Sequence, residues 1–171
     1  MRTPPTPGIL SRLPLFLLVW GIGALAMYVP GIMALVRGNT MVAETFFFNA
    51  TIGLIIITMV TLARASKASR HGTLGQLLAL LATFAFLPIY LALPLYEGLG
   101  NTSYLNAYFD MVSSITTTGA NLFDDPGRLA PSLHLWRALV AWLGGLLMWV
   151  AASAILAPLS LGGFEVTARG E

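Results

Sequence analysis

Cysteine is absent from this chain of 171 residues, and charged residues make up only 9% of it. The lack of cysteine excludes disulfides, thiolate metal sites and cysteine nucleophiles, and it leaves the redox compartment undetermined. Soluble globular proteins carry about 25% charged residues, which keep their surfaces in water. Because 57% of this sequence is hydrophobic instead, we expect an integral membrane protein.

Motifs and charge clusters that would indicate an enzyme or a nucleic-acid binder are also missing. The net charge of +2 is scattered along the chain, whereas nucleic-acid binding needs a clustered basic face. The sequence contains no P-loop, dinucleotide fingerprint, GxSxG or HExxH motif. His71 and His134 fall on opposite predicted sides of the membrane, so they cannot share a metal ion. We therefore expect no enzymatic activity, no resident cofactor and no nucleic-acid partner.

Four uncharged stretches reach or approach the roughly 20 residues that a helix needs to cross about 30 Å of hydrocarbon. They are Leu13–Val36, Thr45–Ala63, Leu74–Tyr96 and Ala138–Leu159. The first follows two arginines, as a secretory signal does, but its apolar run exceeds the about 7 to 15 residues of a signal core. The sequence predicts an all-α membrane protein with four retained transmembrane helices.

The distribution of cations predicts a cytoplasmic N-terminus, because Lys and Arg in short loops tend to stay in the cytoplasm. That orientation leaves three cations outside, which are Arg37, Arg128 and Arg137. It places six inside, which are Arg2, Arg12, Arg64, Lys67, Arg70 and Arg169. The inner basic loop at 64–71 is expected to meet anionic lipid head groups.

The segment between the third and fourth predicted spans, residues 97–137, is neither a short turn nor an ordinary polar loop. Ser103 is a typical helix N-cap, and Tyr104–Ile115 carries apolar residues at helical spacing. Twelve helical residues extend about 18 Å, which is roughly half of the membrane thickness. The sequence then runs through Thr116–Asn121 and returns through a Gly- and Pro-containing turn.

A half-length helix, a Thr-Gly segment and a full span together predict a re-entrant pore helix with a filter loop. Irregular backbone survives at membrane depth only where protein buries it or where it lines a watery cavity. Carbonyl oxygens can replace the water shell of a dehydrated cation, and glycine adopts the positive φ that keeps successive carbonyls on one axis. Gly119 is the candidate for that glycine, while the helix dipole favours a cation near Ile115.

Three segments together resemble the first pore-loop repeat of bacterial Trk-type potassium uptake proteins, within the Trk/Ktr/HKT superfamily. They are FDMVSSITTTGANLF (109–123), LWRALVAWLGGLLMW (135–149) and LSLGGFEV (159–166). The resemblance implies two N-terminal helices in residues 1–72, then one helix–pore loop–helix repeat in residues 73–171. It also implies a multi-pass protein of the bacterial inner membrane.

The resemblance further implies a potassium site formed by backbone carbonyls. In the family, glycine at the position of Gly119 accompanies potassium permeation, and serine accompanies sodium preference. The implied filter residues are Thr117, Thr118, Gly119 and Ala120, with potassium held by the carbonyls of the first three. Thr116, Asn121 and Asp110 flank the filter, and Asp110 stands where many members have glutamate.

One such repeat offers about a quarter of a coordination ring, so other pore-loop repeats or subunits must complete it. A fragment or split subunit of a potassium transporter is the favoured interpretation, over four identical copies around one pore. The resemblance also implies a cytoplasmic nucleotide-binding regulatory ring as a partner. The alternative function is a non-conducting structural helical subunit of a larger membrane complex, in which the Thr-Gly segment is only backbone.

Two polar or small features inside the spans have structural interpretations. Gly144 and Gly145 favour close helix packing over a hinge, and Asn49 is expected to form a hydrogen bond between helices.

Overall fold

The computed structural model describes residues 15–64, 73–120, 122–123 and 125–161, and in this part of the chain all regular structure is helical. Its helices are α1 (Leu15–Ala26), α2 (Tyr28–Val36), α3 (Thr40–Arg64), α4 (Thr73–Leu91), α5 (Leu93–Leu99), α6 (Tyr104–Ile115), the short 3-10 helix η2 (Pro126–Arg128) and α7 (Pro131–Leu161). The described residues include four segments long and apolar enough to cross a membrane, which are Leu15–Val36, Thr40–Arg64, Leu78–Leu99 and Pro131–Ser153. The prediction of an all-α membrane protein is confirmed.

Two of these four segments consist of consecutive helices, and prolines account for both interruptions. A proline lacks a backbone N–H, and its ring collides with the carbonyl four residues earlier. Pro30 therefore acts on Ala26, the last residue of α1, and Pro94 follows directly after the break between α4 and α5. The helical path continues across the first break, because the Gly31 amide donates to the Met27 carbonyl at 3.2 Å.

The core draws on all of the α-helices and includes the fully buried side chains of Trp136, on α7, and Phe46, on α3. Their rings pack edge to face with centroids 5.8 Å apart. The Trp136 indole N–H donates to the Leu91 carbonyl at 3.0 Å, at the last residue of α4. One apolar cluster thus joins the N-terminal helices to the segment that carries the predicted filter.

The predicted interhelical role of Asn49 is confirmed. Its side-chain amide donates to the Glu97 carboxylate at 2.8 Å, which connects α3 with α5. Its backbone carbonyl accepts the Tyr90 hydroxyl at 2.7 Å, which connects α3 with α4. Gly53 lies beside the same tyrosine hydroxyl, where a Cβ would overlap it. Polar contacts and close backbone approach therefore fix α3 against the third span.

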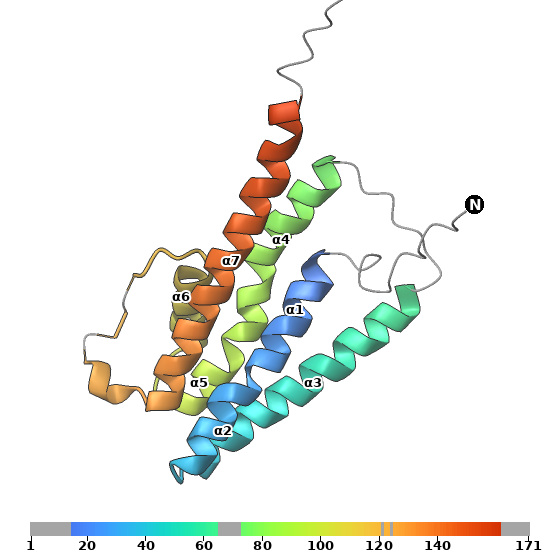
Figure 1. Cartoon of the computed structure of the whole chain (residues 1–171). Helices are drawn as coiled ribbons and strands as arrows, with labels where there is room; N and C mark the ends of the chain where they lie inside the picture. Colours follow the sequence, from blue (N-terminus) through green and yellow to red (C-terminus); the bar gives the residue numbers. More distant parts are fainter. Residues whose placement is uncertain (1–14, 65–72, 121, 124, 162–171) are drawn as a thin grey trace, which may run out of the picture.

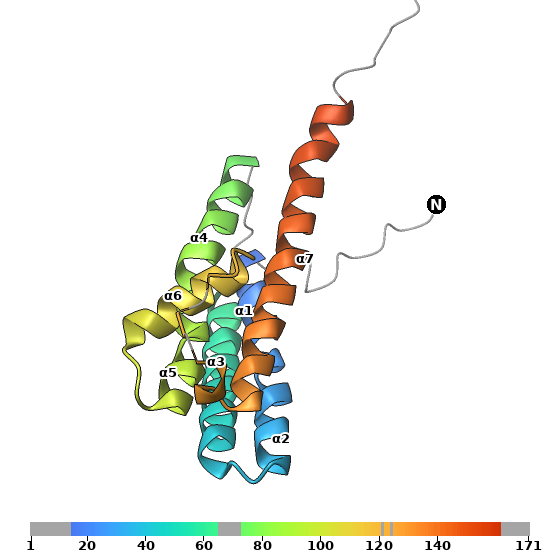
Figure 2. The same cartoon turned by 90° about the vertical axis from the view of Figure 1, so that its left-hand side faces the viewer.

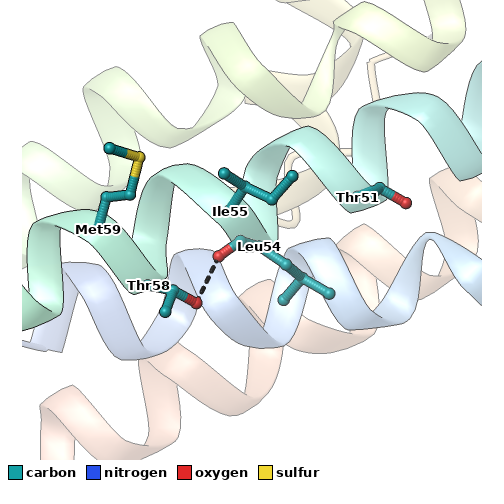
Figure 3. Close-up of a pocket in the computed structure, with 5 residues that line it drawn as sticks. All are labelled: Thr51, Leu54, Ile55, Thr58 and Met59. Carbon is teal, nitrogen blue, oxygen red and sulfur yellow. Dashed lines mark hydrogen bonds between the residues drawn. The ribbon is translucent and has the colours of Figure 1, made fainter.

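The outward faces of the spans are apolar, as a hydrocarbon environment requires. Phe48, Met59, Trp142 and Trp149 each expose more than three-fifths of their surface. A shallow hollow on the outer face of α3 is lined by residues of that one helix, and Figure 3 shows them: Thr51, Leu54, Ile55, Thr58 and Met59. The hydroxyls of its two threonines donate to carbonyls one turn back along the helix.

The short helix α6 lies beside α4 and α7. The excursion between α5 and α7, which contains α6, begins and ends at the same end of the bundle (Figures 1 and 2). The two ends of this excursion are joined directly, because the Arg128 guanidinium donates to the Asn101 side-chain oxygen at 3.2 Å. This arrangement is the one that a re-entrant helix requires.

The last span begins earlier than predicted, at Pro131 rather than at Ala138. The prediction began the uncharged stretch directly after Arg137, which it counted among the outer cations. In the structure Arg137 is a helical residue whose side chain is only 21% exposed and pairs with Asp110. A charge with a buried partner does not end a membrane helix. The remaining inner cations, Arg2, Arg12, Lys67, Arg70 and Arg169, and also His71, lie outside the described residues.

Candidate functional site: a re-entrant helix and its carbonyl turn

The helix that leads to the predicted filter is the 12-residue α6, with the bounds that the sequence predicts. Ser103 caps its first turn, because the Ser103 hydroxyl accepts a hydrogen bond from the Asn106 amide at 3.2 Å. The hydroxyls of Tyr104 and Tyr108, one turn apart, donate to two carbonyls of α4 at 2.6 and 3.1 Å. These contacts set the position of α6 along the third span.

The apolar residues whose spacing predicts this helix are only partly buried. Ile115 is 2% exposed. Leu105 is 71% exposed and Phe109 is 48% exposed. The buried face carries both apolar and polar residues, which are Ala107, Asp110, Met111, Ser113, Ser114 and Ile115. Leu105 and Phe109 form an exposed apolar stripe on the first half of α6.

α6 ends in a Schellman motif, in which two amides beyond the helix bond back to its last turn. The Thr117 amide donates to the Ser114 carbonyl at 3.0 Å, and the Thr118 amide donates to the Ser113 carbonyl at 2.9 Å. The first of these two donor residues, which directly follows the helix C-cap and is usually glycine, must be left-handed. Here it is Thr117, with φ of 56°, which is rare for a β-branched residue.

Gly119 is the second left-handed residue of this turn, with φ of 72°, as the sequence predicts. Thr117, Thr118 and Gly119 are all exposed, whereas Thr116 and Ala120 are half-buried. Among the described residues, the carbonyl oxygens of Thr117, Thr118 and Gly119 accept no hydrogen bond. The carbonyl of Ala120 differs, because it accepts the Ser113 hydroxyl at 3.1 Å. Asn121, a predicted flanking residue, lies outside the described residues.

The carbonyl turn lies near the middle of α7, where a glycine allows the end of α6 to approach closely. A Cβ at Gly144 would overlap the carbonyl oxygen of Ile115, the last residue of α6, so only glycine allows this approach. Gly144 lies about 20 Å along α7 from Pro131, in a 23-residue span about 34 Å long. A Cβ at Gly145 would meet only the Thr117 methyl group, at an ordinary contact distance of 3.7 Å. The close-packing interpretation therefore holds for Gly144.

Asp110 faces α7 rather than the carbonyl turn. The Arg137 guanidinium binds its carboxylate through two hydrogen bonds of 2.8 Å, and the Asp110 side chain is fully buried. The Arg137 guanidinium carbon also lies 5.9 Å from the ring centre of Phe123, on the return from the turn. Sequence reasoning missed this pairing, although Asp110 within a predicted membrane helix was a signal that a cationic partner was needed.

The site that results is a bare segment of backbone at the C-terminal end of a half-length helix. No cluster of His, Cys, Asp or Glu that could hold a metal ion occurs in the described ranges. Free carbonyl oxygens are groups that can replace the water shell of a cation, and the negative end of a helix dipole favours positive charge.

Curated proteins with similar sequences include potassium uptake proteins and an uncharacterised cation transporter. The chain is 40% identical over 77 residues to the Trk system potassium uptake protein TrkI of Halomonas elongata, covering 45% of this chain and 16% of that protein. It is 28% identical over 145 residues to TrkH of Salmonella typhimurium, covering 82% of this chain and 29% of the relative. It is 35% identical over 66 residues to an uncharacterised cation transporter of Methanocaldococcus jannaschii, covering 39% and 14%.

The chain spans less than a third of the length of these relatives. No family model and no solved structure matches it. The resemblance to Trk-type potassium uptake proteins is confirmed by the relatives, over more than four-fifths of this chain for TrkH.

Proposed function

We propose that this chain takes part in potassium transport across a membrane, as one quarter of the selectivity filter of a Trk-type uptake system. The observation that carries the proposal is the row of carbonyl oxygens on Thr117, Thr118 and Gly119, which have no donor among the described residues. They lie at mid-depth of a bundle whose relatives are named as potassium uptake proteins.

The chemistry of the turn favours potassium over a strongly hydrated ion. Neutral carbonyl oxygens replace the hydration shell of a cation without binding it so tightly that it cannot leave. The turn between Thr116 and Ala120 contains no charged side chain, and the carboxylate of Asp110 is neutralised by Arg137. The dipole of α6 adds partial negative charge at the same end.

The exposure of the turn supports an incomplete ring. One chain supplies the carbonyls of a single turn, whereas a filter encloses the ion on all sides. The exposed apolar stripe of α6, at Leu105 and Phe109, is a surface for a neighbouring pore-loop repeat. These repeats come from a continuation of the chain or from other polypeptides. In this proposal a cytoplasmic nucleotide-binding ring regulates the assembly, which lies in the bacterial inner membrane with the N-terminus inside.

The test is the substitution Gly119→Ser in the assembled transporter, expressed in cells that lack their own potassium uptake. Serine disfavours the φ of 72° and brings a side chain to the turn, so the potassium-over-sodium selectivity is expected to fall. Gly100→Ser is the matched control, because Gly100 has φ of 68° and equally open surroundings but lies in the turn between α5 and α6.

Gly100→Ser is expected to leave selectivity unchanged. If Gly119→Ser also leaves selectivity unchanged while the protein folds normally, the filter assignment is wrong. The chain is then the alternative, a structural helical subunit whose Thr-Gly turn is ordinary backbone.

A further inference from the structure

We propose that Ser113 is the positioning residue of the carbonyl turn, and that its hydroxyl withdraws the Ala120 oxygen from the ion path. Three oxygens, those of Thr117, Thr118 and Gly119, then face the ion. This inference rests on the proposed function, because it concerns the geometry of the same filter.

The carbonyl turn is hydrogen-bonded back to Ser113. Its carbonyl accepts the amides of Thr118 at 2.9 Å and Gly119 at 3.4 Å, and the Thr116 hydroxyl also lies 3.4 Å from it. This carbonyl belongs to the last turn of α6, where carbonyls lack partners within the helix. The start of the turn is thus anchored by backbone bonds that any residue at position 113 would provide.

The far side of the turn depends on the Ser113 side chain instead. The hydroxyl, on a residue only 5% exposed, donates to the Ala120 carbonyl at 3.1 Å. This bond joins residues seven apart and closes the turn back onto the helix. A carbonyl that accepts a hydroxyl proton has its negative end engaged, so it is a weaker ligand than its free neighbours. The hydroxyl therefore sets where the row of free oxygens ends.

The neighbouring serine makes this role specific to Ser113. Ser114 is also buried, and its carbonyl accepts the Thr117 amide, but its hydroxyl makes no bond to residues 116–120. Both serines accept backbone amides of the turn, but of their two side chains it is the Ser113 hydroxyl that bonds to Ala120. They form a matched pair for an experiment.

The experiment compares Ser113→Ala with Ser114→Ala in the assembled transporter, by the ratio of potassium to sodium uptake. Ser113→Ala keeps the backbone anchors but frees the Ala120 oxygen, so the selectivity ratio is expected to fall on the order of two- to tenfold, as for loss of one hydrogen bond. Ser114→Ala is expected to leave the ratio unchanged. Ser113→Thr restores a hydroxyl and is expected to recover most of the ratio.

A second measurement follows the turn without transport. Amide hydrogen exchange in the detergent-solubilised chain is expected to become faster at residues 118–120 in Ser113→Ala, and to stay unchanged in Ser114→Ala. Equal exchange and equal selectivity in the two alanine variants overturn the inference. If Gly119→Ser lowers selectivity while Ser113→Ala does not, this inference fails and the proposed function stands. If exchange becomes faster in Ser113→Ala but neither Gly119→Ser nor Ser113→Ala alters selectivity, both this inference and the proposed function fail.

Discussion

Two residues at the candidate site have a backbone conformation or a degree of burial that their residue types disfavour. Thr117 takes a left-handed conformation at the helix end, where glycine would be unstrained, and the cost is of the order of 1–2 kcal/mol. Asp110 is a fully buried carboxylate, which a membrane helix tolerates only with a partner. Thr117 lies in the carbonyl segment and Asp110 lies about two helical turns before it, so the strain and the buried charge are concentrated at the candidate site.

The Asp110–Arg137 pair gives a prediction at this scale. Arg137→Gln removes the cation but leaves the buried carboxylate, so the free energy of unfolding is expected to fall by about 3–5 kcal/mol. Arg128→Gln is the control, because Arg128 is exposed and its one bond to Asn101 is worth about 1 kcal/mol or less. Denaturant titration in detergent micelles measures both variants.

The double variant Asp110→Asn/Arg137→Gln removes both charges and keeps two polar groups that can bond to each other. It is expected to recover part of the loss. An Arg137→Gln protein as stable as the parent would contradict the view that this pair fixes α6 to α7.

At the scale of elements, the contact between α6 and α7 decides how deep the carbonyl turn lies. Tyrosine hydroxyls fix α6 on the side of α4, but on the side of α7 the approach depends on the absence of a side chain at Gly144. The Asp110–Arg137 pair lies on the same interface, nearer the start of α7. Two contacts about two helical turns apart on α7 therefore hold both the middle and the end of the half-length helix.

Gly144→Ala tests this contact. The new methyl group collides with the Ile115 carbonyl, which is backbone and cannot rotate away, so the cost is expected to be about 1–3 kcal/mol. Gly145→Ala is the matched control, since its Cβ would find only an ordinary contact and alanine favours helix. Thermal unfolding in detergent compares them, and equal melting temperatures would show that α7 does not pack closely against α6.

At the scale of the whole molecule, the re-entrant segment enters and leaves at one end of the bundle, and its turn lies near the middle of α7 (Figure 1). The turn between α2 and α3 lies at the end where the re-entrant segment enters and leaves (Figure 1). In the sequence, most of the cations lie before α1, between the end of α3 and α4, and after α7, which predicts that these segments face the cytoplasm. The division into residues 1–72 and 73–171 stays a prediction, and in the described residues both parts contribute to one apolar core.

Orientation can be tested directly, because the chain has no cysteine of its own. A membrane-impermeant maleimide added to intact cells stripped of their outer membrane is expected to label Arg37→Cys, in the exposed turn after α2. Arg64→Cys, exposed at the end of α3, is expected to react only after the membrane is permeabilised. The reverse pattern would mean that the re-entrant segment enters the membrane from the cytoplasmic side.

Much of the local structure followed from the sequence. Long uncharged stretches predicted four spans, the spacing of apolar residues after Ser103 predicted α6 to the residue, and Gly119 was correctly expected to have a positive φ. These features depend on interactions within a few residues, such as capping, helical periodicity and the conformational freedom of glycine.

The tertiary structure decided what depends on residues far apart in the chain. Apolar periodicity predicted α6, yet Leu105 and Phe109 of that pattern are exposed while Asp110 is buried. The reason is that the buried face of α6 meets Arg137 and Gly144 from another helix. The left-handed Thr117 and the Ser113 bond to Ala120 have no signature in composition or spacing. The sequence determined which segments enter the membrane, since that is a matter of local hydrophobicity. Packing between segments determined which oxygens stay free, since that requires every competing donor to be placed in space.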